Sequence, residues 1–296
     1  MKLTAGKWDR ADQNIYFAAN IPNMMIETAK MTDYLLVAIN EISSSYEQTV
    51  DRWIAEGKSV FVDSGVFNLA SQHARTHGIS HDSALNMAPD EIDGFDALLD
   101  RYCAILGRIG DRCWGYIEID QGGRDNKIKT RNRLEALGFS PIPVYHPLLD
   151  GWDYFDELAS QYDRICVGNL VQAHSTIRRR IIRTIWDRCQ AYPGLWVHLL
   201  GVTPGPFMIA YPTASCDSST LSALTRWPMT AGTKANTPIS LESGPPLSER
   251  YVYRLGGDAS SPDGYLKAHR LGAYNARMLC RNWRSIADEY ERGGLA

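Results

Sequence analysis

Four polar residues, Asp63, Asp120, His146 and Asp217, each directly follow a short apolar segment of this 296-residue chain. A carboxylate can act as a nucleophile or as a general acid or base, and an imidazole can orient or transfer protons. If the apolar segments are parallel strands, their carboxyl ends meet at one edge, and these side chains lie close together. The pattern predicts a site for nucleophilic or acid/base chemistry.

Each of these residues also has a structural interpretation. Asp217 precedes Ser-Ser-Thr and could cap a helix, and Asp63 precedes Ser64–Gly65, which is ordinary turn chemistry. Asp120 begins a glycine-containing loop, and His146 before Pro147 could be a hydrogen-bonded histidine at the rim of a sheet. His198 lies inside an apolar segment, which favours the core or a position behind a site.

Eight short apolar segments can position these side chains. Most are continuously apolar rather than alternating, which is typical of parallel strands covered on both faces. They span residues 15–18, 34–39, 59–62, 115–119, 142–145, 164–167, 196–200 and 214–216.

Helical patterns separate these segments, most clearly in residues 89–107, in residues 125–138 and after Ser175. The alternation predicts an α/β fold, a single (β/α)8 TIM-type barrel over residues 1–296, with an open doubly wound sheet as the alternative. Residues 228–264 are rich in Pro, Gly, Ser and Thr, which predicts an irregular insertion or lid, with only residues 251–255 resembling a strand. We expect a C-terminal helix over residues 265–291.

The strand ends of such a barrel would present Asn20, Asn40, Asp63, Ser64, Gly65, Asp120, His146, Gly168, Asn169, Gly201 and Asp217 at one mouth.

Composition narrows the classes of function. The formal net charge is −3, so nucleic-acid contact requires local basic patches. The six cysteines form no Cys-x-x-Cys pair, which argues against a disulfide framework or zinc cluster, and we expect no metal or cofactor. The N-terminus lacks a signal-like apolar core, and the longest apolar run, residues 35–39, is too short for a bilayer. The expectation is a cytoplasmic protein with no membrane contact.

Two basic stretches could contact phosphate. In the C-terminal stretch, no acidic residue separates Lys267, Arg270, Arg277, Arg281 and Arg284, and the last four share a helical face. The other contains Arg178, Arg179, Arg180 and Arg183, for which a solvated helix face is the favoured alternative.

The strand-end motifs occur in a recognisable order. They are Val62-Asp63-Ser64-Gly65-Val66-Phe67, Glu118-Ile119-Asp120, Pro143-Val144-Tyr145-His146, Cys166-Val167-Gly168, Leu200-Gly201-Val202-Thr203 and Ser215-Cys216-Asp217-Ser218-Ser219-Thr220. Over residues 15 to 225 this set resembles the tRNA-guanine transglycosylase superfamily. It is most similar to the compact phage and bacterial members that insert 7-deazaguanine bases into DNA.

The resemblance implies a guanine transglycosylase, a pentosyltransferase, in a bacterium or phage-infected host. Asp217 would form a covalent glycosyl-aspartate, and Asp63 would transfer protons. Asp120 would recognise the guanine edge, and Ser64, Gly65, Phe67, His146, Gly168, Asn169 and Gly201 would bind the base. Phe67 or Tyr145 could stack on it, although Tyr145 could equally be a core residue. The partners would be DNA and a free 7-deazaguanine base such as 7-cyano-7-deazaguanine.

Two departures from the tRNA enzymes matter. Val66 and Asn68 replace a glycine and a glutamine of the first motif, and the C-terminal zinc-binding cysteine pattern is absent. The second departure favours DNA over tRNA. A tRNA enzyme of the same chemistry, a base-excising N-glycosidase and a non-catalytic nucleic-acid-binding barrel subunit remain the alternatives.

Overall fold

The computed structural model describes residues 2–8, 15–19, 25–29, 32–202 and 214–219, and the backbone of residues 229–231 and 238–240. The expected helix over residues 265–291 and its five basic residues lie outside the described residues. So do Asn20, Thr220 and the strand-like residues 251–255.

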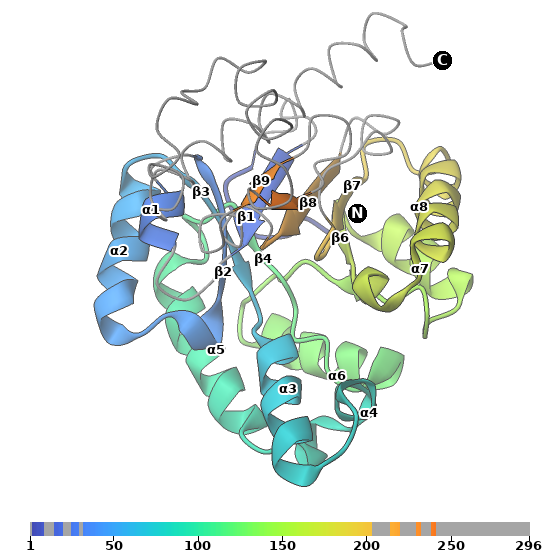
Figure 1. Cartoon of the computed structure of the whole chain (residues 1–296), viewed down its shortest axis with the longest axis horizontal. Helices are drawn as coiled ribbons and strands as arrows, with labels where there is room; N and C mark the ends of the chain where they lie inside the picture. The colour runs from blue at the N-terminus through green and yellow to red at the C-terminus, as the bar shows by residue number, and fades with distance from the viewer. Residues whose placement is uncertain are drawn as a thin grey trace, which may run out of the picture.

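A sheet of eight parallel strands forms the centre of the molecule (Figure 1). The strands are β1 (Ile15–Ala19), β2 (Tyr34–Ala38), β3 (Ser59–Asp63), β4 (Gly115–Tyr116), β5 (Val144–Tyr145), β6 (Arg164–Val167), β7 (Trp196–Leu199) and β8 (Ala214–Ser218). Their order is β4-β3-β2-β1-β8-β7-β6-β5, so β1 pairs with β8 and consecutive strands are otherwise neighbours. All eight predicted strands are confirmed, and the order is the cyclic one of a (β/α)8 fold.

The two edge strands, β4 and β5, do not form a regular ladder. They meet at one isolated parallel bridge between Ile117 and Ile142, with hydrogen bonds from Ile142 N to Tyr116 O at 2.8 Å and from Glu118 N to Ile142 O at 3.0 Å. Pro141 and Pro143 flank Ile142, and neither has an N–H to donate. The predicted closed barrel is therefore wrong in this respect: the sheet is curled and (β/α)8-like, but its ladder is interrupted at the β4–β5 seam.

The helices lie around the outside of the sheet (Figure 1). They are α1 (Met25–Thr28), α2 (Ser44–Ala55), α3 (Val66–His77), α4 (His81–Asn86), α5 (Phe95–Ile109), α6 (Gly123–Ala136), α7 (Trp152–Gln161) and α8 (Ser175–Cys189). Short 3-10 turns add η1 (Ile39–Glu41), η2 (Pro89–Glu91) and η3 (Leu170–Gln172). The helix predicted over residues 89–107 is divided, because Gly94 adopts a left-handed conformation (φ 82°) before α5. The other two predicted helices are confirmed as α6 and α8.

Aromatic side chains fill the interior of the curled sheet. Phe17, Phe61, Trp114 and Trp196 are buried there, and the Trp114 ring lies 4.8 Å from Phe17 and 4.9 Å from Phe61 between centroids. The outer face of the sheet packs against the helices through two larger apolar clusters. The interior is therefore a packed core, as in barrel enzymes, and leaves room for a site only at the strand ends.

The segment predicted to be irregular contains regular structure. Residues Met229–Ala231 (β9) and Pro238–Ser240 (β10) pair as an antiparallel two-stranded sheet. The irregular interpretation is wrong for these six residues, since short antiparallel pairs need no long apolar run to form. Among the described residues, no helix combines the length and apolar character needed to cross a bilayer.

Candidate active site

A cavity of about 550 Å³ opens at the carboxyl ends of the strands. Six of the eight strands or the turns that follow them contribute its polar wall: Asp63, Asp120, His146, Gly168–Asn169, Gly201 and Asp217. The volume lies within the usual range for small-molecule pockets. The parallel sheet thus brings the sequence-predicted polar residues together.

Asp217 lies within β8, which extends two residues beyond the predicted strand end. Its Oδ1 is 3.1 Å from Nε2 of His198 and accepts a hydrogen bond from Gly201 N at 3.0 Å. Both partners belong to β7 or the turn after it, so among the described residues Asp217 caps no helix. Its Oδ2 has no hydrogen bond with the described residues, although the residue lines the cavity. One oxygen is held in place and the other is available for chemistry.

His198 orients Asp217 from behind. The ring is buried, its Nδ1 lies 2.8 Å from Ser215 Oγ, and Trp196 Nε1 donates to the same Oγ at 2.8 Å. Because the indole N–H can only donate, Ser215 Oγ accepts that bond and can give its own hydrogen to Nδ1 of His198. This tautomer places the imidazole proton on Nε2, where it is donated to Asp217.

The sequence placed His198 in the core or behind a site, and the structure agrees. The alternation of side chains along a strand could also have identified the partners of His198, because Ser215 and Asp217 are two residues apart and share one face of β8. Ser215 is paired with His198 in the register of β7 and β8.

Asp63 ends β3 and has a raised pKa. Burial is the main cause and raises the pKa of Asp63 to about 7. The negative charges of Asp120 and Asp217 raise the pKa further, with Asp120 the larger of the two. The hydrogen bond from Gly65 N to Asp63 Oδ2 at 3.0 Å acts in the opposite direction and lowers it. Gly65 adopts a left-handed conformation (φ 81°), and a Cβ there would lie 2.8 Å from Oδ1 of Asn40. Only glycine fits this turn without strain. Asp63 can therefore hold and release a proton near neutral pH.

The pKa of Asp120 is shifted in the opposite direction. Burial favours the neutral acid, but the hydrogen bond and charge of His146, together with the charge of Lys127, outweigh it and lower the pKa of Asp120. Nε2 of His146 lies 2.9 Å from Oδ2 of Asp120. The pKa values of two aspartates in one cavity thus shift in opposite directions because their neighbours differ.

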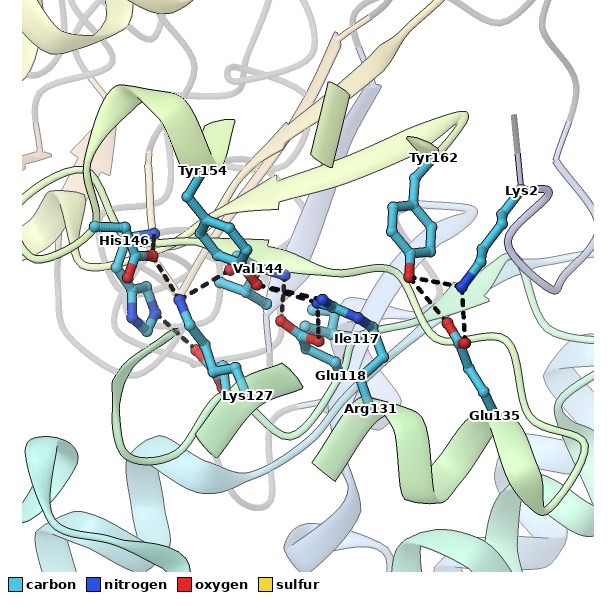
Figure 2. Close-up of polar contacts among 12 residues, drawn as sticks. Lys2, Ile117, Glu118, Lys127, Arg131, Glu135, Val144, His146, Tyr154 and Tyr162 are labelled. Atoms are coloured by element: carbon cyan, nitrogen blue, oxygen red, sulfur yellow. Dashed lines mark hydrogen bonds and ion pairs between the residues drawn. The ribbon is translucent and has the colours of Figure 1, made fainter. Parts of the chain in front are cut away.

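A buried ion pair fixes His146. Lys127 Nζ lies 2.6 Å from Oδ2 of Asp150 and donates to Val144 O at 3.0 Å, and both charged side chains are almost fully enclosed. The same Asp150 oxygen accepts from His146 N at 2.8 Å (Figure 2). Lys127 of α6 therefore holds the backbone of Val144 directly and the backbone of His146 through Asp150.

Two buried polar atoms on the cavity wall have no partner among the described residues: Nδ1 of His146 and Oδ1 of Asn169. Asn169 is also the one non-glycine residue of the described part with a positive φ, 46°. Unsatisfied polar atoms and an unusual backbone conformation are common where a ligand binds.

The two glycines Gly168 and Gly201 line the cavity and also pack closely against neighbouring protein groups. A Cβ on Gly168 would lie 2.7 Å from the His146 ring, and a Cβ on Gly201 would lie 2.9 Å from Cγ1 of Val171. The missing side chains make room for neighbouring protein groups, and Gly201 N also binds Asp217. A side chain at either position would therefore collide with the protein itself.

Most other predicted site residues also reach the cavity. Ser64 and Phe67 line it, whereas Gly65 acts through its amide on Asp63 and Asn40 lies behind Gly65. Phe67 is 54% exposed, with its ring 4.3 Å from that of His81. Tyr145 is fully buried, so it is a core residue and not a stacking platform. Lys267, Arg270, Arg277, Arg281 and Arg284 lie outside the described residues.

Comparison with known proteins adds no relative. No protein-family model matches the chain, and no curated protein matches its sequence. Fold and site together define an α/β protein of (β/α)8-like architecture with a carboxylate-lined cavity at the carboxyl edge of its sheet.

Proposed function

We propose that this protein is a guanine transglycosylase that exchanges guanine in DNA for a free 7-deazaguanine base, such as 7-cyano-7-deazaguanine. The observation that supports this most is the pairing, in one cavity, of Asp217 with Asp63. Oδ2 of Asp217 has no hydrogen bond with the described residues, and the pKa of Asp63 is raised to about 7. A nucleophile and a proton carrier are the two groups that a retaining displacement at a sugar carbon requires.

In the first half-reaction, Oδ2 of Asp217 attacks C1′ of the target nucleotide. The C1′–N9 bond breaks, its electron pair stays on the guanine, and Asp63 donates a proton to the departing base. The hydrogen bonds from His198 and Gly201 to Oδ1 hold the carboxylate in line with C1′. The product is a glycosyl-aspartate ester and free guanine.

In the second half-reaction, Asp63 is ionised and takes the proton from N9 of the entering 7-deazaguanine. That nitrogen attacks C1′ and displaces the Asp217 carboxylate, which restores the original configuration. The His198 N–H stabilises the carboxylate as it leaves. Each half-reaction returns Asp63 to the state that the other needs.

Recognition of the base falls to Asp120 in this proposal. Its carboxylate is ionised and fixed by His146, so it can accept hydrogen bonds from the ring imino group and exocyclic amine of guanine. Oδ1 of Asn169 is a further acceptor and Nδ1 of His146 a further polar group without a partner among the described residues. A 7-deazaguanine presents the same donor edge, so one pocket serves both bases.

The test is exchange of radiolabelled guanine into guanine-containing DNA, with tRNA as a parallel substrate. We expect incorporation into DNA and a protein–DNA adduct on denaturing gels. Asp217→Asn should lower the exchange rate at least about a thousandfold and abolish the adduct. Asp82→Asn is the matched control, because Asp82 also lines the cavity and has no role in the proposed reaction; it should retain exchange within about tenfold.

Other outcomes identify the alternatives. Incorporation into tRNA alone would make the chain a tRNA enzyme of the same chemistry. Release of guanine without uptake of a replacement base would indicate an N-glycosidase. Nucleic-acid binding with no exchange and no effect of Asp217→Asn would indicate a non-catalytic subunit and overturn the proposal.

A further inference from the structure

A second group of potential ligand atoms lies outside the cavity, at the C-terminal end of α3. His73 and His77 are one helical turn apart, with ring centroids 4.2 Å from each other, and Asp93 faces them from the segment between η2 and α5. One donor atom from each of the three side chains lies within 4.8 Å of the other two. The proposed reaction uses none of these residues.

The hydrogen bonds of this cluster leave two acceptors facing each other. Asp93 N donates to Nδ1 of His73 at 3.2 Å, so that nitrogen is an acceptor, and a metal ion would have to take its lone pair in place of this hydrogen bond. The same nitrogen lies only 3.3 Å from Oδ2 of Asp93. A lone pair and a carboxylate oxygen at this distance repel unless a positive charge lies beside them.

The carboxylate of Asp93 is shared by both rings. Nε2 of His77 lies 2.6 Å from Oδ2 of Asp93, which is hydrogen-bond distance. Oδ2 of Asp93 therefore lies near one nitrogen of each imidazole ring, and a cation bound there would be coordinated by all three atoms.

We propose that His73, His77 and Asp93 bind a divalent transition-metal ion of the zinc type. Two imidazole nitrogens and one carboxylate oxygen form a common three-ligand set for zinc, and histidines spaced i, i+4 on a helix present their nitrogens on one side. His73 is buried and would anchor the ion, whereas the side chains of His77 and Asp93 are 47% and 68% exposed and leave a path for its entry. Water would occupy the remaining positions.

The bound ion would stabilise the structure and would take no part in the proposed reaction. α3 begins directly after Asp63-Ser64-Gly65, and α3 and α4 form one wall of the cavity. The ion would lie about 15 Å along α3 from the cavity, given the rise of a helix. It would join the end of α3 to the segment before α5 and so hold that wall in place.

The experiment uses the full chain, stripped of metal with a chelator and titrated with Zn²⁺ by equilibrium dialysis at pH 7.5. We expect one ion per chain with a Kd in the micromolar range or below, and a rise in Tm of about 5 °C at saturation. Co²⁺ in place of Zn²⁺ should give visible absorption of a low-coordinate site with nitrogen ligands.

His77→Ala and Asp93→Asn change exposed side chains, so both variants should fold, which far-ultraviolet circular dichroism checks. Each should weaken Zn²⁺ binding at least about tenfold and abolish the rise in Tm. His174→Ala, which removes another exposed histidine at the start of α8, is the matched control and should bind Zn²⁺ as the wild type does.

Wild-type affinity no better than that of His77→Ala, or equal loss in His174→Ala, would overturn the metal site. None of these measurements needs catalytic activity, so their outcome is separate from that of the proposed function.

Discussion

Three aspartates of the cavity share one residue type and differ in what surrounds them. Asp63 is half-buried next to other negative charges, Asp120 is paired with His146, and Asp217 receives two hydrogen bonds on one oxygen. Desolvation and negative charge raise the pKa of Asp63, whereas the hydrogen bond and charge of His146 lower the pKa of Asp120. The division of roles is therefore a property of the neighbours.

The raised pKa of Asp63 predicts that its removal stabilises the fold at high pH. Between the ordinary pKa of 3.8 and the folded value of about 7, the folded state binds a proton that the unfolded state has released, so stability falls as pH rises through this window. Asp63→Asn has no charge to bury and can keep the hydrogen bond from Gly65. We expect it to be more stable than the wild type by roughly 1–3 kcal/mol at pH 8.

Urea denaturation at pH 4 and pH 8 measures this difference, which should be small at pH 4. Asp82→Asn, at an exposed position of the same cavity, should show no such pH dependence. An equal effect of Asp63→Asn at both pH values would show that its charge is not destabilising.

At the scale of the element, α8 connects the cavity to a basic surface. Arg178 donates to the backbone oxygens of Leu170, Val171 and Ala173, which ties α8 to η3 at the cavity rim. Arg179, Arg180 and Arg183 are exposed and have no ion pair with the described residues. Because α8 follows β6, its first turns lie at the same edge of the sheet as the cavity.

This placement predicts that α8 contacts the phosphates of DNA. Reversal of the three charges, in Arg179→Glu/Arg180→Glu/Arg183→Glu, should weaken DNA binding at least about tenfold and lower the slope of log K against log salt by about 2 to 3. Fluorescence anisotropy of a labelled duplex and single strand over a salt series gives both quantities.

The matched control reverses Lys7, Lys129 and Arg133. These cations are also exposed and have no ion pair with the described residues, but Lys129 lies at the middle of α6 and Arg133 in its last turn, towards the other end of the sheet. Equal loss in both triple variants would show that only net charge matters. The predicted C-terminal basic stripe stays a prediction.

At the scale of the whole molecule, side chains link β4 and β5, between which the sheet has no regular backbone ladder. Glu118 follows β4 and accepts from Val144 N of β5 at 2.6 Å, and its other oxygen lies 2.8 Å from Arg131 of α6 (Figure 2). Glu118 is fully buried. The sequence motif that contains Glu118 and Asp120 thus combines a structural residue with a cavity residue.

Glu118→Ala should therefore destabilise the fold by about 3–5 kcal/mol, since it leaves Arg131 as a buried charge without its carboxylate and Val144 N without an acceptor. Denaturant unfolding with a probe for the whole chain measures this loss. Glu157→Ala removes a surface partner of Arg124 and should cost at most about 1 kcal/mol. Similar losses in the two variants would mean that Glu118 does not hold the seam.

The sequence alone predicted the eight strands, the positions of α6 and α8, and the set of polar residues at the strand ends. This was possible because short, continuously apolar segments that alternate with helical patterns are typical of buried parallel strands, and parallel strands bring their carboxyl ends to one edge. Asp63, Asp120, His146 and Asp217 follow from that rule without knowledge of any contact.

Only the tertiary structure decided how those residues behave. The open β4–β5 seam depends on Pro141 and Pro143 opposite a two-residue strand. The hydrogen bond from His198 to Asp217, the unequal pKa values of Asp63 and Asp120, and the meeting of His73, His77 and Asp93 all join residues from different elements. Charge, protonation and ligation depend on the distances between individual atoms of such residues, and the sequence pattern predicts which residues share an edge but not those distances.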